Sequence, residues 1–237
     1  MKQTVFILLI IMGSLSSFGQ KRAVIENLAS FDESAFHFGF VLGYNKSNFR
    51  AEFNQTNYSF GGDSLIAVGI ESQPGFNLGI VSSLNISPNL KLRFVPSLSF
   101  QERKVNYTYS LSQFSDSTTS LDQRVESTFL DFPVYLKFRT LRANNFAAYV
   151  LGGVKYSLDM ASQKDVKLEE ILKIKKPDFS YELGIGTDFF LEYFKFGLEL
   201  KFSMGITNSL IQENNRFSRP IDNLRNQMWL LSITFEG

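Results

Sequence analysis

Apolar and polar side chains alternate without interruption from Phe194 to Gly205. Phenylalanine, leucine and methionine occupy the even positions, whereas lysine, glutamate, serine and glycine occupy the odd ones. Because successive side chains of a β-strand point to opposite faces of the sheet, this period of two predicts a strand with one apolar and one polar face. Seven further stretches show the same pattern, so the sequence predicts an all-β protein.

The predicted strands are separated by links of alternating length. The strands are expected near 35–47, 73–86, 90–110, 126–139, 146–158, 179–191, 194–205 and 227–235. Short links follow the second, fourth and sixth strands, and long polar links (48–72, 111–125, 159–178 and 206–226) follow the others. Short turns at one end and long loops at the other are typical of barrels in the bacterial outer membrane, whereas a soluble β-sandwich gives no reason for this regularity. We therefore expect an eight-stranded antiparallel transmembrane β-barrel over residues 35–237, surrounded by lipid and with both termini periplasmic.

The first residues carry an export signal. Lys2 is followed by the apolar run Val5–Met12 and then by small residues up to Gly19. This run is shorter than the roughly 20 apolar residues that a membrane-spanning helix needs, which favours a cleaved signal peptide over an uncleaved anchor. We predict a signal peptide at residues 1–19, cleavage before Gln20, a periplasmic segment at 20–34 and location in the outer membrane.

Composition excludes several classes of function. The chain has 24 Lys and Arg against 23 Asp and Glu, and loss of Lys2 leaves the mature chain neutral, so nothing indicates a nucleic-acid partner. Cysteine is absent, which excludes disulfides, thiolate metal sites and a lipid-attachment cysteine. No phosphate-binding loop, metal-ligand spacing or nucleophile motif is present, so we expect no cofactor, no metal and no small-molecule substrate.

The polar faces of the predicted strands carry charges of nearly balanced sign. Eight strands enclose a lumen that side chains can fill, so we expect a packed ionic network and no pore. The candidates for this interior network are His37, Arg93, Asp131, Lys137, Arg139, Glu182, Asp188, Glu199 and Lys201. Several glycines, among them Gly39 and Gly186, share the inward face, where they either make room for large side chains or relieve strain at bends.

Evidence for catalysis is weak. His37 is the only histidine, and it lies near the periplasmic start of the first strand, which is the wrong end for surface chemistry. A pair of buried carboxylates would allow acid chemistry, but ion pairing with lysine and arginine is the commoner arrangement. We expect no enzymatic activity. A lipid-modifying enzyme or a protease is the distant alternative, and it would require essential carboxylates or hydroxyls in the loops.

One long link is a candidate surface for a protein partner. Between Lys164 and Lys176, charged residues alternate with aliphatic ones, a pattern compatible with an amphipathic helix or with a solvated loop. The candidate partner-binding residues are Lys164, Lys167, Glu169, Glu170 and Lys173.

Five segments resemble the PorT/SprT family. They are Phe36–Asn45, Pro74–Val81, Leu92–Phe100, Val125–Pro133 and Tyr193–Phe196, in the same order along most of the mature chain. The resemblance implies an outer-membrane barrel needed for type IX protein secretion and, in gliding bacteria, for motility, with other secretion-system proteins as partners and no known catalytic residues. A small surface-binding or adhesin-like barrel remains the alternative, because periodicity alone indicates only a small outer-membrane barrel.

Overall fold

The chain forms one closed sheet in which every strand pairing is antiparallel. The computed structural model describes residues 26–54, 59–60, 63–110, 118–161 and 171–237. The elements are η1 (Phe31–Glu33), β1 (Phe36–Phe53), β2 (Ser59–Phe60), β3 (Asp63–Asn85), β4 (Leu90–Phe94), β5 (Ser97–Ser110), β6 (Thr118–Arg139), β7 (Phe146–Asp159), β8 (Pro177–Phe190), β9 (Lys195–Gly205) and β10 (Ile221–Glu236). The predicted signal peptide and four of the candidate partner residues (Lys164, Lys167, Glu169 and Glu170) lie outside the described residues.

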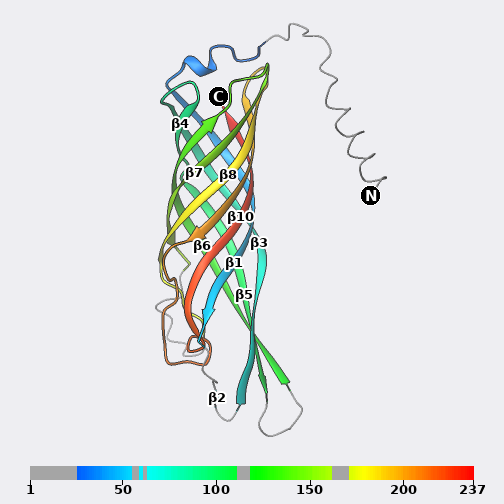
Figure 1. Ribbon diagram of the computed structural model, residues 1–237, viewed down its shortest axis with the longest axis vertical. Helices are drawn as coiled ribbons and strands as arrows, with labels where there is room; N and C mark the ends of the chain where they lie inside the picture. The colour runs from blue at the N-terminus through cyan, green and yellow to red at the C-terminus, as the bar shows by residue number, and fades with distance from the viewer. Residues whose placement is uncertain (1–25, 55–58, 61–62, 111–117, 162–170) are drawn as a thin grey trace, which may run out of the picture.

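The ring closes because β1 pairs with β3 on one side and with β10 on the other. Strands β4 and β5 both lie between β3 and β6, one after the other, so together they fill one position in the wall. The described wall therefore has eight positions: β1, β3, β4 with β5, β6, β7, β8, β9 and β10 (Figure 1). The predicted all-β antiparallel barrel is confirmed.

The number of strands differs from the prediction for two reasons. The predicted strand 90–110 is divided into β4 and β5, because Pro96 has no backbone N–H to donate to a neighbouring strand. The carbonyl of Pro96 still accepts a hydrogen bond of 3.0 Å from the backbone N–H of Ile80. The two-residue strand β2 pairs with the start of β3 and was not predicted.

The ends of the barrel differ in shape (Figure 1). At the turn end, β3–β4, β6–β7 and β8–β9 are joined by short turns, and both β1 and β10 have an end there. At the loop end, β3, β5 and β6 extend beyond the closed wall. The pairing of β3 with β1 ends at Gln73, and the pairing of β6 with β7 ends at Phe129. We call this extension, residues 63–72, 101–110 and 118–128, the flap. The predicted long links 48–72 and 111–125 are thus partly strand.

The outer face of the wall is apolar. Exposed phenylalanine, leucine, isoleucine and valine side chains cover it, including Phe38 and Leu42 of β1, Ile80 of β3, and Leu136 and Phe138 of β6. No helix in the described part of the chain is long and apolar enough to cross a membrane.

The inner face changes character along the barrel. Near the turn end and the middle it is ionic, whereas at the loop end it is apolar. The loop-end cluster consists of Phe49, Val105, Tyr107, Tyr109, Val125, Leu172, Ile174, Leu210, Phe217, Ile221 and Leu224. Four of these residues belong to the segments 171–176 and 206–220, so both segments pack onto the inner face of the strands. The hydroxyl of Tyr107 donates to the Phe217 carbonyl at 2.8 Å and ties the second segment down.

Candidate functional site: the filled interior and its two ends

Glu199 on β9 is the centre of the ionic network. Its carboxylate contacts the guanidinium of Arg93 on β4, and it accepts hydrogen bonds from Lys201 Nζ and Tyr149 Oη, each at 2.9 Å. Glu199 and Lys201 point inward together because they are two residues apart on one strand. Gly186 leaves the space that Tyr149 needs, since a Cβ there would lie 2.5 Å from the tyrosine Cζ. The observed role of this glycine is the close approach of a large side chain.

Glu236, at the end of β10, forms a second centre next to the first. Arg93 Nη2 lies 3.2 Å from one oxygen of Glu236, and Lys195 Nζ lies 2.8 Å from the other. All three side chains are buried. Arg93 therefore joins the carboxylates of β9 and β10, strands that are far from β4 in sequence.

Two further groups complete the interior. Lys137 Nζ binds both oxygens of Asp188, at 2.8 and 2.9 Å. Lys155 Nζ lies 2.7 Å from Glu182 and 3.8 Å from Asp131. These cations and carboxylates are buried, and each has an opposite charge beside it. Buried charges are tolerated only when they are paired in this way, so the network is a condition for folding of the interior.

The segment before β1 closes the turn end of the barrel. Phe31 of η1 is 7% exposed and stacks on the ring of His37 at a centroid distance of 3.7 Å. Asp32 pairs with Lys91 at 3.1 Å and with Arg139 at 2.8 Å. Residues 26–34 belong to the segment 20–34 that was predicted to be periplasmic, and the structure places Phe31 of this segment in the mouth of the barrel. We call residues 27–34 the N-terminal plug.

The charge on Asp32 is strongly favoured. Burial alone would raise the pKa of this carboxyl, but the hydrogen bond from Arg139 and the positive charges of Lys91 and Arg139 outweigh it and lower the pKa from 3.8 to about 2. Asp32 therefore remains ionised throughout the ordinary pH range and binds the plug to two strands.

His37 is buried between the plug and β3. Its Nε2 lies 3.2 Å from Asn85 Nδ2, and its ring contacts Phe31. The contacts are those of a packed interior histidine. Among the described residues, no group of three or more histidines and carboxylates is arranged to hold a metal ion.

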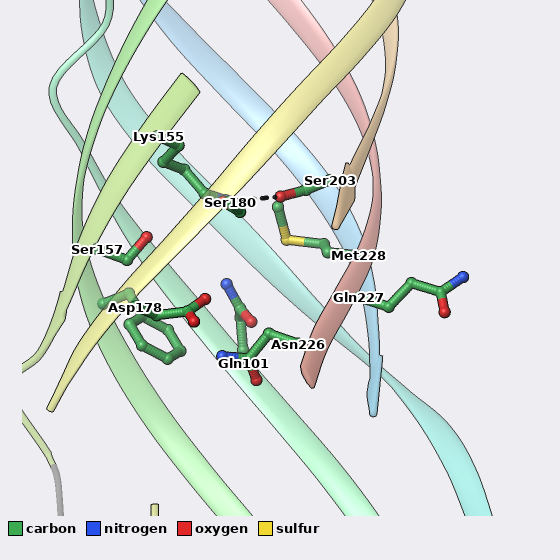
Figure 2. A pocket seen from close by; sticks show the side chains of 10 residues that line it. Gln101, Lys155, Ser157, Asp178, Ser180, Ser203, Asn226, Gln227 and Met228 are labelled. Atoms are coloured by element: carbon green, nitrogen blue, oxygen red, sulfur yellow. Dashed lines mark hydrogen bonds between the residues drawn. The ribbon is translucent and has the colours of Figure 1, made fainter. Parts of the chain in front are cut away.

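Two small cavities lie inside the wall. One cavity of about 10 Å³ lies where the ionic region meets the loop-end cluster, and Figure 2 shows Gln101, Asp178 and Asn226 gathered around it. A hydrogen bond of 3.3 Å from Ser203 to Ser180 crosses its wall. A second cavity, of about 20 Å³, lies beside Tyr135 and Met228. Cavities of this size hold about one water molecule each, so neither of the two is an aqueous channel.

A larger hollow, of about 300 Å³, lies beside the β3 bulge at Gly75. Phe76, Phe100 and Thr128, which line it, are on the outward-facing positions of their strands. Gln101 and Ser127, which also line it, are on inward-facing positions.

The structure buries all nine residues of the predicted interior network and brings eight of them into ion pairs with other residues. His37 is the exception. Sequence reasoning missed Lys195 and Glu236, although both share the inward parity of their strands. It also missed Lys91, which lies two residues before Arg93. Asp32 carried no sequence signal, because it lies outside any alternating pattern.

Lys173, the one described candidate of the partner-binding set, faces the interior of the loop end. It is 9% exposed and pairs with Glu213 at 2.8 Å. Residues 171–176 are not helical, and Ile174 instead forms a β-bridge with Leu210. The side chain of Lys173 is thus occupied within the protein.

A closed antiparallel barrel with an apolar outer face and an ionic interior defines a bacterial outer-membrane β-barrel protein. A family described as "Outer membrane protein beta-barrel domain" matches residues 18–210, and the chain belongs to this family.

Several solved structures are similar to this chain. Neisserial surface protein A shares 8% identity over 85% of this chain and 96% of its own, with a TM-score of 0.45. OprG from Pseudomonas aeruginosa shares 12% identity over 84% of this chain and 94% of its own, with a TM-score of 0.40. Ail, the attachment invasion locus protein of Yersinia pestis, shares 11% identity over 86% of this chain and 100% of its own, with a TM-score of 0.37. No curated protein matches the chain.

Proposed function

We propose that this outer-membrane barrel is a non-catalytic component of type IX protein secretion, which supports assembly or stability of the translocon while another protein forms the conduit. The secretion assignment is supported by the resemblance to the PorT/SprT family. The non-conduit role is supported by one observation, the filled interior, whose cavities of about 10 and 20 Å³ could not pass a polypeptide. In gliding bacteria, the same component would also serve motility.

The proposed topology places the turn end in the periplasm. Residues 1–19 would be removed as a signal peptide, the plug would then lie on the periplasmic side, and the flap would extend outside the cell. Short periplasmic turns and long external loops are the arrangement that outer-membrane barrels share.

Contact with the translocon would be made through surfaces. Among the described residues, two strand edges of the flap have no neighbouring strand: β3 lacks a partner strand on its β1 side from Leu65 to Ser72, and β6 lacks one from Thr118 to Ser127. Such edges can pair with a further strand. The polar link containing Lys164, Lys167, Glu169 and Glu170 remains a proposed contact as well.

The experiment is deletion of the gene and complementation with the wild-type chain. Type IX cargo is quantified in the culture medium and in the periplasm, and immunoblotting of outer membranes verifies that the complementing protein is present. We expect cargo to accumulate in the periplasm of the deletion strain and to return to the medium on complementation. Normal export by the deletion strain would contradict the proposal.

A surface-binding barrel is the second candidate, and the flap is the observation that favours it. Its outward face carries the charged residues Glu71, Lys104, Asp122 and Arg124 beyond the apolar band. Loss of attachment to surfaces with intact secretion would support this alternative.

A further inference from the structure

Three cations lie close together on the outer face of the wall at the loop end. Lys46 and Arg50 are outward-facing residues of β1, and Arg225 is an outward-facing residue of β10. β1 and β10 are neighbours along this part of the wall (Figure 1), and Arg50 is directly opposite Arg225 in their register. Lys46 precedes Arg50 by four residues, which corresponds to about 13 Å along a strand.

None of these cations has an ion-pair partner within the part of the chain that the structure describes. Other cations of the loop end are paired: Lys104 with Asp122 at 2.9 Å, and Arg124 with Glu102 at 3.5 Å. The carboxylate closest in register is Glu52, which accepts a hydrogen bond from Asn223 at 3.3 Å. The Nε–H of Arg225 is buried and donates to no described acceptor.

This arrangement is unfavourable in the protein alone. Like charges directly opposite each other on antiparallel strands repel, and a buried donor without an acceptor costs additional free energy. An anion between Arg50 and Arg225 would remove the repulsion, because guanidinium groups can each donate two parallel hydrogen bonds to its oxygens.

The position of the cluster identifies the source of the anion. Trp229 is directly opposite Lys46 and contacts Phe202 at a centroid distance of 4.8 Å, while Tyr44 lies one outward position closer to the apolar band. Tryptophan and tyrosine gather where the hydrocarbon of a membrane meets its headgroups. The aromatic residues therefore place Lys46 at headgroup level and the two arginines just beyond it.

We propose that Lys46, Arg50 and Arg225 bind the phosphorylated headgroup of an anionic lipid in the outer leaflet. The two arginines hold one phosphate, and Lys46, on the membrane side, meets a second negative group of the same headgroup. The choice of leaflet rests on the proposed topology, in which the loop end faces outward. The site would anchor the β1–β10 seam at a fixed depth in the membrane.

The test is native mass spectrometry of the purified mature protein in detergent micelles, with bisphosphorylated lipid A as the probe. The double variant Arg50→Gln/Arg225→Gln is compared with Lys104→Gln/Arg124→Gln, which removes the same charge from the paired cations of the flap. We expect roughly tenfold weaker lipid binding for the first variant, equivalent to about 1.4 kcal/mol, and no change for the second. Equal binding by both variants, or equal loss in both, would overturn the proposal.

Two further measurements distinguish related explanations. Dephosphorylated lipid A should bind the wild type as weakly as the phosphorylated lipid binds the arginine variant; equal binding of the two lipids would exclude phosphate recognition. Inorganic phosphate that displaced the lipid at equal concentration would indicate a free-anion site and contradict a lipid site.

In lipid-free micelles, the arginine variant should unfold at a temperature no lower than the wild type, because it loses a repulsion. The secretion assay of the deletion strain is independent of these results.

Discussion

At the scale of single residues, Asp32 determines how firmly the plug is held. Because its folded-state pKa of about 2 lies below its ordinary value of 3.8, ionised Asp32 stabilises the folded state above pH 3.8. This contribution falls as the pH is lowered from 3.8 towards 2 and is absent below that range. Asp32 is half-buried, so solvent screens part of the interaction.

Replacement Asp32→Asn should lower the free energy of unfolding by about 1 kcal/mol at pH 7, because Arg139 and Lys91 lose their charged partner. Urea unfolding of the refolded barrel in micelles would measure this. The stability difference between wild type and variant should shrink as the pH falls from 4 to 2. Glu33→Gln, at the exposed neighbouring residue, is the control and should leave stability unchanged. A difference that grew on acidification would contradict the ion pairs assigned to Asp32.

Glu199 should be much more sensitive to substitution than Asp32. In Glu199→Gln, Lys201 would lose its only ion-pair partner in the described structure, and Arg93 would keep Glu236 alone. Breaking a buried pair by removing one member typically costs about 3 to 5 kcal/mol. The same urea unfolding experiment measures it, with Glu192→Gln in the exposed β8–β9 turn as the matched control. An equally small effect in both variants would mean that Glu199 is not the centre of the network.

At the scale of elements, the alternation of apolar and polar residues predicted the position of every wall strand, because every second side chain of a membrane-spanning strand is expected to face lipid and to be apolar. Boundaries at the loop end were not predicted, because the pattern changes phase there. Register shifts between Leu65 and Ala67 and between Ser72 and Phe76 insert extra residues into β3, after which even and odd positions exchange faces. In the proposed topology the flap projects beyond the membrane, where water rather than lipid would contact its outer face, and a smaller difference in polarity between its two faces is then expected.

The assignment of faces can be tested on β9. Leu198 is 41% exposed on the outer face, where lipid is its expected solvent. Leu198→Arg should destabilise the folded barrel by roughly 2 to 4 kcal/mol if this position is near the middle of the membrane. Unfolding in lipid vesicles is the measurement, and Tyr193→Arg in the exposed turn before β9 should have little effect. A tolerated arginine at Leu198 would mean that this face is not in contact with lipid.

At the scale of the whole molecule, the sequence predicted part of the inward-facing charge, without Lys91, Lys195 and Glu236, and it did not predict which charges meet. Arg93 and Glu199 are 106 residues apart, and only the tilt and closure of the barrel bring them together. The plug and the loop-end cluster were also unpredicted, because Phe31 and Phe217 are isolated apolar residues in polar segments, and Leu172 lies in a link that was interpreted as a partner-binding surface. Together, the plug, the ionic network and the apolar cluster fill the barrel from one end to the other. The central claim is therefore that this protein acts through its surfaces and not as a channel.

Electrical conductance tests that claim most directly. The purified mature protein would be reconstituted in planar lipid bilayers, and current would be recorded under an applied voltage in molar salt. A barrel whose described interior has room for about one water in each cavity should give no stable conductance steps. Long-lived steps of uniform size, in proportion to the inserted protein, would contradict the account and show that the interior opens into a pore.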